Sequence, residues 1–190
     1  PENSYLHTVL HTRRGIPVTL GLLWMELAQG VGLQARGVAF PGHFMVKALL
    51  PKGQVVMDPF TGQSLSREDL SERLAPYQRS AGPSDPDEIP LGTYLQAATP
   101  RDIIARMLRN LKELHRAQQD WPRLLAVQNR LVVLLPQSWP EWRDRGLAHA
   151  QCGHGAQAVS DLQTYLANVQ NAKDVAAVAD QVNQLRSAGL

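Results

Sequence analysis

Apolar residues change their spacing part-way through the first third of this chain. From Pro17 to Gly30 they recur every three or four positions, which predicts a helix that ends at Gly30 and Gly32. The apolar runs that follow are short, β-branched and bounded by turn residues, which is typical of strands. We expect these strands at Val38–Phe40, Phe44–Leu50 and Val55–Asp58, with a turn at Pro51–Gly53 between the last two.

A second change comes at Ser80–Pro90, which is rich in proline, serine, glycine and aspartate and has no hydrophobic period. We interpret it as a linker. Ahead of it, Ser66 and Asp69 resemble a capping box that begins a short helix to about Leu74. Beyond it the apolar spacing is helical throughout, and a capping residue followed by proline marks several starts. The predicted helices cover about 100–118, 121–135, 139–152, 156–169 and 173–187.

The helical part also resembles itself. A shift of 34 residues places Leu125 on Val159 and Leu131 on Tyr165. A 34-residue period in helix pairs is typical of tetratricopeptide repeats, which this segment resembles, and a plain helical bundle is the alternative. The sequence therefore predicts a front domain over 1–79, a linker over 80–98 and helical repeats over 99–190.

Composition narrows the possible roles. The 190 residues carry a formal net charge of +2, 44% are hydrophobic and 19% are charged. We find no basic run that would favour nucleic acid or a membrane surface, and no apolar run of bilayer length. The single cysteine, Cys152, fits a reducing compartment, so we expect a cytoplasmic protein that binds neither nucleic acid nor membrane.

Three short motifs of the front domain carry candidate chemistry. They are Gly15–Ile16–Pro17 at a helix start, Pro41–Gly42–His43–Phe44 before a strand, and Asp58–Pro59–Phe60 after the next strand. The turn between the strands should bring His43 beside Asp58. An imidazole oriented by a carboxylate is part of a nucleophile–base–acid triad. The third member should be a thiol at a helix N-terminus, where the helix dipole stabilises the thiolate.

The order and spacing of these motifs resemble the transglutaminase-like superfamily, and most closely its bacterial SirB-type branch. The resemblance also includes Asn3–Ser4–Tyr5–Leu6 and Arg13–Arg14, and it covers about residues 1–77. It implies an α+β, papain-like cysteine-protease-type fold followed by all-α tetratricopeptide repeats. Family members carry a further helical segment ahead of the Asn–Ser–Tyr–Leu motif, so we expect the chain to be a fragment.

Carried over onto this chain, the resemblance gives His43 the triad-histidine position and Asp58 the orienting-acid position. The nucleophile position falls on Pro17, which has no nucleophilic atom. Thr19 lies nearby, but its position two residues along the helix points it elsewhere. Cys152 belongs to the helical tail, where a lone cysteine is more often a small buried hydrophobe. Neither residue restores a triad, so the three positions are interpreted as vestigial.

Other candidate sites are weaker. His7 and His11 have metal-ligand spacing on one helical face without a third ligand, and His149–Cys152–His154 spans a predicted helix end and turn. We expect neither a metal nor a cofactor. Three tryptophans at helix starts are expected to pack between repeats rather than stack on a ligand, namely Trp121, Trp139 and Trp142.

The functional prediction is a non-catalytic interaction protein, a pseudoenzyme whose repeats, with or without the vacant cleft, bind a protein or peptide. The alternative is a hydrolase or amide-bond enzyme in which His43 activates water and Asp58 orients the His43 imidazole. The His–Asp pair can also be only a tie between two strands, worth about 1 to 3 kcal/mol when shielded from water. An open, polar pocket at His43 would favour the enzyme interpretation. An apolar or filled cleft at His43 would favour the interpretation as a binding module.

Overall fold

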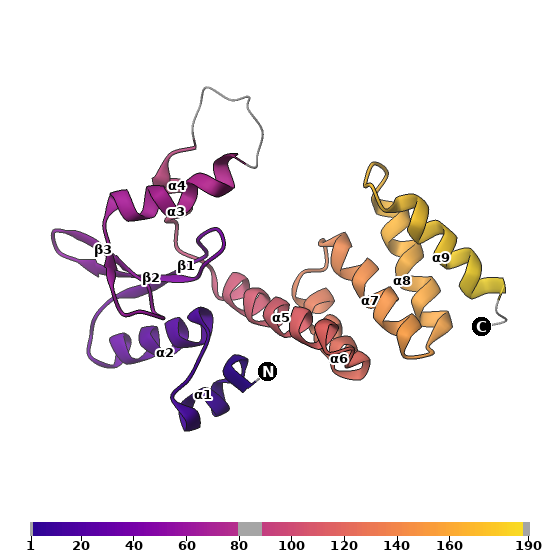
Figure 1. The fold of residues 1–190 in the computed structure, drawn as a ribbon, viewed down its shortest axis with the longest axis horizontal. Coiled ribbons are helices and arrows are strands. Elements are labelled where there is room, and N and C mark those ends of the chain that lie inside the picture. Colours follow the sequence, from indigo (N-terminus) through magenta and orange to yellow (C-terminus); the bar gives the residue numbers. More distant parts are fainter. Residues whose placement is uncertain (1, 80–88, 188–190) are drawn as a thin grey trace. The chain divides into compact units, whose positions relative to one another are not determined.

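Figure 1 shows the computed structural model, which describes residues 2–79 and 89–187. Contacts divide the chain into two compact units, Pro1–Met107 and Leu108–Leu190. Most of the predicted linker, residues 80–88, lies outside the described residues. Each unit is described by itself below.

The front unit combines short helices with one small antiparallel sheet, whose strand order is β1-β2-β3-β4. The strands are β1 (Ala35–Val38), β2 (Met45–Leu50), β3 (Gly53–Met57) and β4 (Ser64–Leu65). The helices are η1 (Glu2–Ser4), α1 (Leu6–Thr12), α2 (Pro17–Gly30), α3 (Arg67–Arg79), α4 (Leu91–Tyr94) and the first part of α5 (Pro100–Ala117). Sequence neighbours pair in the sheet, where a tight turn joins β2 to β3 and a longer loop joins β3 to β4.

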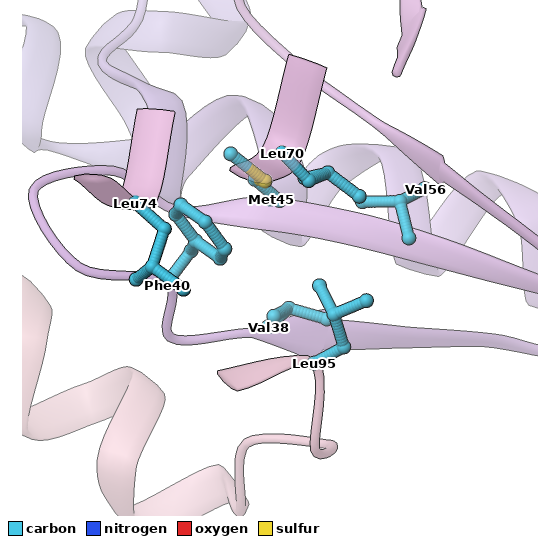
Figure 2. Close-up of a cluster of buried hydrophobic side chains, with 7 residues drawn as sticks. All are labelled: Val38, Phe40, Met45, Val56, Leu70, Leu74 and Leu95. Carbon is cyan, nitrogen blue, oxygen red and sulfur yellow. The ribbon is translucent and has the colours of Figure 1, made fainter. Parts of the chain in front are cut away.

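The side chains of β2 alternate between two buried clusters, one on each face of the sheet. Met45 faces a cluster with residues of α3 and the segment after α4, formed by Val38, Phe40, Met45, Val56, Leu70, Leu74 and Leu95, which Figure 2 shows. Phe44 and Val46 instead belong to a cluster with Val18 of α2 and Ile103 of α5. The sheet is therefore covered by helices on both faces.

Phe44 fixes how closely α2 approaches the sheet. A Cβ on Gly21 of α2 would lie 2.7 Å from the Phe44 ring, so only glycine leaves room for this aromatic side chain. On the sheet edge, Ala98 donates to Gly37 O over 2.8 Å and Lys47 donates to Leu95 O over 2.7 Å. These contacts secure the segment after α4 to the front unit.

The second unit is entirely helical in its described part. It contains the end of α5, then α6 (Trp121–Leu134), α7 (Trp139–Gln151), α8 (Gly155–Asn168) and α9 (Val175–Ser187), and α6 to α9 contact one another in sequence order. The main buried cluster joins α8 to α9 through Leu162, Tyr165, Val178 and Val182. Gly146 of α7 allows Leu162 of α8 to approach, because a Cβ there would lie 2.8 Å from that side chain.

The predicted fold class is confirmed, with a mixed helix-and-sheet front unit followed by a helical repeat segment. The capping box is also confirmed, since Ser66 and Asp69 exchange hydrogen bonds of 2.8 and 3.1 Å. The helix that it opens runs on to Arg79 with Pro76 inside it, beyond the expected end at Leu74. The expected strand Val38–Phe40 is displaced to Ala35–Val38, and β4 and α4 were not predicted. The helix implied by the spacing of His7 and His11 is α1, whose bounds were not predicted. The contact division falls inside α5, while the boundaries 1–79, 80–98 and 99–190 stay a prediction.

Candidate functional site

His43 and Asp58 lie just outside the ends of two paired strands. His43 precedes β2, Asp58 follows β3, and Val46 stands opposite Met57 in the register between them. This register brings the start of one strand beside the end of the other. His43 Nε2 lies 2.9 Å from Asp58 Oδ1, so the expected His–Asp pairing is confirmed. With Asp58 ionised, Nε2 donates this hydrogen bond, and Nδ1 of the neutral ring is left as an acceptor.

The Asp58 carboxylate is buried, with 3% of the residue exposed, and three donors surround it. Besides His43, the Phe60 amide donates to Oδ1 over 2.9 Å and Arg73 Nη1 donates to Oδ2 over 3.2 Å. Burial alone would raise the pKa of the Asp58 carboxyl, but the hydrogen bonds from His43, Phe60 and Arg73 outweigh it and lower the pKa below its ordinary value. Asp58 is therefore a fixed anion at neutral pH, while the His43 side chain is 26% exposed and reachable from solvent.

Two further residues of this site come from α3 and were missed by the sequence reasoning. Arg73 holds the second carboxylate oxygen of Asp58. Tyr77 covers the turn before His43, where Gly42 has a φ of +68° and a Cβ would overlap the Tyr77 hydroxyl. Their four-residue spacing places both side chains on one face of α3, but no local pattern connects that face with a strand end earlier in the chain.

Pro17, the residue at the expected nucleophile position, is the first residue of α2. The helix start is fixed by Thr19, whose fully buried hydroxyl accepts from the Ile16 amide over 3.0 Å and lies 3.1 Å from Asn3 O. Val18 packs in the same buried cluster as Phe44, so the start of α2 lies against the segment that carries His43. The Thr19 hydroxyl caps this helix and ties it to η1.

Comparison with protein families divides the chain close to the boundary between its two compact units, after Met107. A model of the transglutaminase-like superfamily matches residues 1–109, and a tetratricopeptide repeat model matches residues 111–183. This chain belongs to the transglutaminase-like superfamily.

Relatives of this transglutaminase-like chain are bacterial proteins named UPF0162 protein. One from Xylella fastidiosa (strain Temecula1) is 40% identical over 167 residues, which cover 87% of this chain and 58% of the relative. One from Pseudomonas aeruginosa is 35% identical over 72% of this chain and 47% of the relative. One from Vibrio cholerae is 28% identical over 97% of this chain and 66% of the relative. The chain thus spans 58% of the length of its Xylella relative. No solved structure matches it. The resemblance to SirB-type proteins with tetratricopeptide repeats is confirmed.

Cys152 lies in the repeat unit, at the end of α7. It is the C-cap of α7, its amide donates to Ala148 O over 3.1 Å, and its half-buried side chain packs beside Leu124, Leu125 and Ala148. This packing agrees with the expectation of a small hydrophobic residue.

The repeat segment contains a buried network of charges. Lys112 of α5, which is 8% exposed at its side chain, contacts Glu141 Oε2 at 2.7 Å and Asp144 Oδ2 at 2.5 Å, both on α7. Arg109 adds a 2.9 Å contact to Glu141, and Arg143 reaches Asp144 at 2.7 Å. Burial opposes the ionisation of Asp144, but Lys112 and Arg143 lower the pKa of its carboxyl below the ordinary value. The network ties the end of α5 to α7.

Beside this network the repeats form a groove of about 460 Å³. Its apolar lining comes from α6, α7 and α9, and its charged lining comes from side chains that already form ion pairs with one another. Among the lining residues are Trp121, Leu124, Leu147, Ala148, Ala177 and Val178, together with Arg116, Arg143, Asp144 and Asp174. The groove thus offers apolar surface with fixed, paired charges at its rim.

The remaining candidates are not brought into one site. His7 and His11 are exposed on α1, and His149 Nδ1 lies 3.3 Å from His154 Nδ1. No group of three or more metal-ligating side chains occurs in residues 2–79 and 89–187. Trp121 and Trp139 pack against the buried clusters of the repeats, and Trp142 donates to Pro136 O over 3.0 Å. None of the helices that the structure describes combines the length and apolar character of a membrane crossing.

Proposed function

We propose that this chain is a non-catalytic protein-interaction module, in which the repeat groove binds a peptide of a partner protein and the transglutaminase-like unit has no nucleophile. The observation that carries the proposal is Pro17 as the first residue of α2. Proline supplies no atom that can attack a carbonyl, and the neighbouring hydroxyl of Thr19 is engaged in capping the helix.

The ionic surroundings of His43 support the same role. A triad acid balances the imidazolium that forms when histidine accepts a proton. Here both oxygens of Asp58 already accept hydrogen bonds, and one of those donors is the cationic Arg73. The charge of Asp58 is therefore already balanced by Arg73.

The repeat unit supports binding. Stacked helical repeats form concave surfaces that proteins use for recognition. The groove offers Leu147, which is 37% exposed, and a lysine at that position would place an unpaired charge on the apolar lining. We expect Leu147→Lys to abolish capture of a partner by the full chain. Val133→Lys is the matched control, because Val133 is 81% exposed on α6 outside the groove lining. Equal capture by both variants would exclude the groove as the binding surface.

Activity measurements test the non-catalytic part. The protein should incorporate no amine into a glutamine substrate and should cleave no peptide in a thiol-dependent way. Thiol-reactive reagents should label only Cys152 and change no binding. Amine incorporation that such a reagent abolishes would contradict the proposal.

The second candidate function is a hydrolase or amide-bond enzyme that uses His43 as a base on water. The 2.9 Å contact from His43 to Asp58 and the exposed edge of the imidazole favour it. This role requires turnover that is lost in His43→Ala and Asp58→Asn and that persists after thiol alkylation. If no such turnover is found with ester or amide substrates, the binding role is retained.

A further inference from the structure

The turn between α7 and α8 brings two histidines together. Gly153 follows the C-cap Cys152 with a φ of +76°, in the left-handed region that glycine favours. The Gly153 amide donates to Ala150 O over 3.1 Å, and the His154 amide donates to His149 O over 2.9 Å. These two hydrogen bonds form a Schellman motif, which places the residue after the glycine beside the residue five positions earlier. The two residues that meet here are His154 and His149.

A Schellman motif commonly pairs two apolar side chains, whereas this one pairs two imidazoles. His149 Nδ1 lies 3.3 Å from His154 Nδ1, and the ring centroids lie 5.5 Å apart, so the Nδ1 edges of the rings face each other. A neutral imidazole carries a hydrogen on one nitrogen and a lone pair on the other. Two lone pairs that face each other repel, so this arrangement is stable only with a proton or a metal ion between the two Nδ1 atoms.

The separation of the two nitrogens matches the geometry of a tetrahedral metal. Bonds from zinc to histidine nitrogen are about 2.0–2.1 Å long, so two imidazole nitrogens on one tetrahedral zinc ion lie about 3.3–3.4 Å apart. The observed 3.3 Å agrees with this value, so both nitrogens can reach one ion through small rotations of their rings. His154 is exposed and His149 is half-buried, which leaves the pair open to solvent.

The neighbouring side chains leave room for an added cation. Arg145, one turn before His149 on α7, is already paired with Asp161 through contacts of 2.6 and 2.7 Å. Cys152 packs against the buried cluster of α6 and α7, so its thiol is not a ligand. No third metal-ligating side chain joins the pair in the part of the chain that the structure describes. An ion bound by the two histidines would therefore keep open positions for water or an added ligand.

We propose that His149 Nδ1 and His154 Nδ1 together bind a divalent transition-metal ion of tetrahedral preference, such as zinc. Imidazole nitrogen suits zinc, whereas magnesium and calcium prefer oxygen ligands. The site belongs to the repeat unit, and it does not depend on the proposed function. It departs from the expectation of no metal, because two histidines on either side of a helix end were not expected to converge.

The experiment is a titration of the isotope-labelled full chain, without an affinity tag, with zinc chloride near neutral pH. Nitrogen NMR of the histidine side chains distinguishes Nδ1 from Nε2 in each ring. We expect saturable shifts of Nδ1 in both His149 and His154 at sub-millimolar zinc, with both Nε2 atoms protonated. Magnesium chloride at the same concentrations should shift neither ring.

Histidine variants test whether the two rings act together. His149→Ala and His154→Ala should each weaken zinc binding at the remaining ring about ten-fold or more, because a second ligand on the same turn acts at a high effective concentration. His11→Ala is the matched control, since His11 lies exposed on α1 with His7 four residues earlier. Its zinc affinity at His149 and His154 should equal that of the original chain.

The turn is tested by Gly153→Val, because a β-branched residue strongly disfavours the left-handed backbone at this position. Zinc binding should weaken about three-fold or more, although both histidines are still present. Gly62→Val is the matched control, since Gly62 has a similar φ of +73° in the front unit. This variant should bind zinc as the original chain does.

Zinc that produces no saturable shift at the two Nδ1 atoms would overturn the site. A hydrogen that stays on one Nδ1 at saturating zinc would also overturn it, because the pair would then share only a hydrogen bond. Equal zinc affinity in His149→Ala and the original chain would assign binding to a single ring and contradict the paired site. Unchanged affinity in Gly153→Val would refute the role of the Schellman turn in positioning the two rings.

Discussion

Replacing Pro17 by cysteine tests whether the geometry of a triad survives in this chain. The substitution should be tolerated, because Thr19 rather than Pro17 caps the helix, and the first N–H of a helix has no intrahelical partner. The lost rigidity of proline in the unfolded chain should cost about 1 kcal/mol or less. Pro17 is half-buried, so an introduced thiol would remain reachable by a small alkylating reagent.

The expected pKa of this thiol follows from its surroundings. The N-terminus of α2 should stabilise the thiolate by about 0.3 to 1 kcal/mol, which lowers the pKa by roughly 0.2 to 0.7 units. A protonated His43 nearby adds a comparable amount. Together they should move the midpoint of alkylation from about 8.5 to about 7.5. At pH 7 the thiolate fraction then rises about eight-fold, and the lower nucleophilicity of a weaker base reduces the gain in rate to about three-fold.

The assay is the pH dependence of alkylation with Cys152 replaced by serine, repeated with His43→Ala. Removal of His43 should raise the midpoint by roughly half a unit, leaving the dipole effect alone. Pro140→Cys is the matched control, since Pro140 lies exposed in the first turn of α7, and its thiol should not respond to His43. If the thiol at position 17 is equally indifferent to His43, the pair is only a tie between strands and the triad interpretation fails.

Three further measurements address stability and domain organisation. Lys112→Met should lower the free energy of unfolding by about 3 kcal/mol in urea titrations, because it leaves Glu141 and Asp144 buried with fewer cations. Adding Glu141→Gln should recover part of this loss. Lys173→Met, at an exposed lysine, is the control and should change the free energy of unfolding little. The folded-state pKa of Asp144 lies below its ordinary value of 3.8. Its contribution to stability should therefore be complete above pH 3.8 and should be lost as the pH falls through the lowered pKa. Asp144→Asn should consequently make the free energy of unfolding less dependent on pH in the acid range. Limited proteolysis should cut within Ser80–Pro90. The two pieces should stay together under native conditions, because Leu95 and Ile103 are buried in the front core. Release of a folded 1–79 piece would instead support the predicted domain boundary at residue 79.

The sequence predicted best those elements that local signals specify. Helices α5 to α9 each combine a recognisable start with apolar residues at helical spacing, so their bounds fall within a few residues of expectation. By contrast, α1 has no side-chain cap, β4 has two residues and α4 has four, so none of them carries a pattern of useful length. The strand displaced to Ala35–Val38 shows the same limit, because its extent is set by pairing with β2 rather than by its own residues.

The candidate site divides in the same way. His43 and Asp58 could be paired from the sequence because one hairpin joins their strands. Arg73 and Tyr77 could not be assigned to it, since they reach it from α3 through packing that no short spacing encodes. The buried Lys112 was missed for the same reason, because its partners lie on α7 and an isolated lysine in a helix is typical of a solvated face.

The residues that sequence reasoning missed are those that determine what the front site can do. A His–Asp pair alone has an uncompensated carboxylate, which is the arrangement that assists a base catalyst. Arg73 removes that advantage by holding the second oxygen of Asp58. The absence of a nucleophilic atom at Pro17 and the charge balance around Asp58 are independent features of the chain, and both favour binding over catalysis.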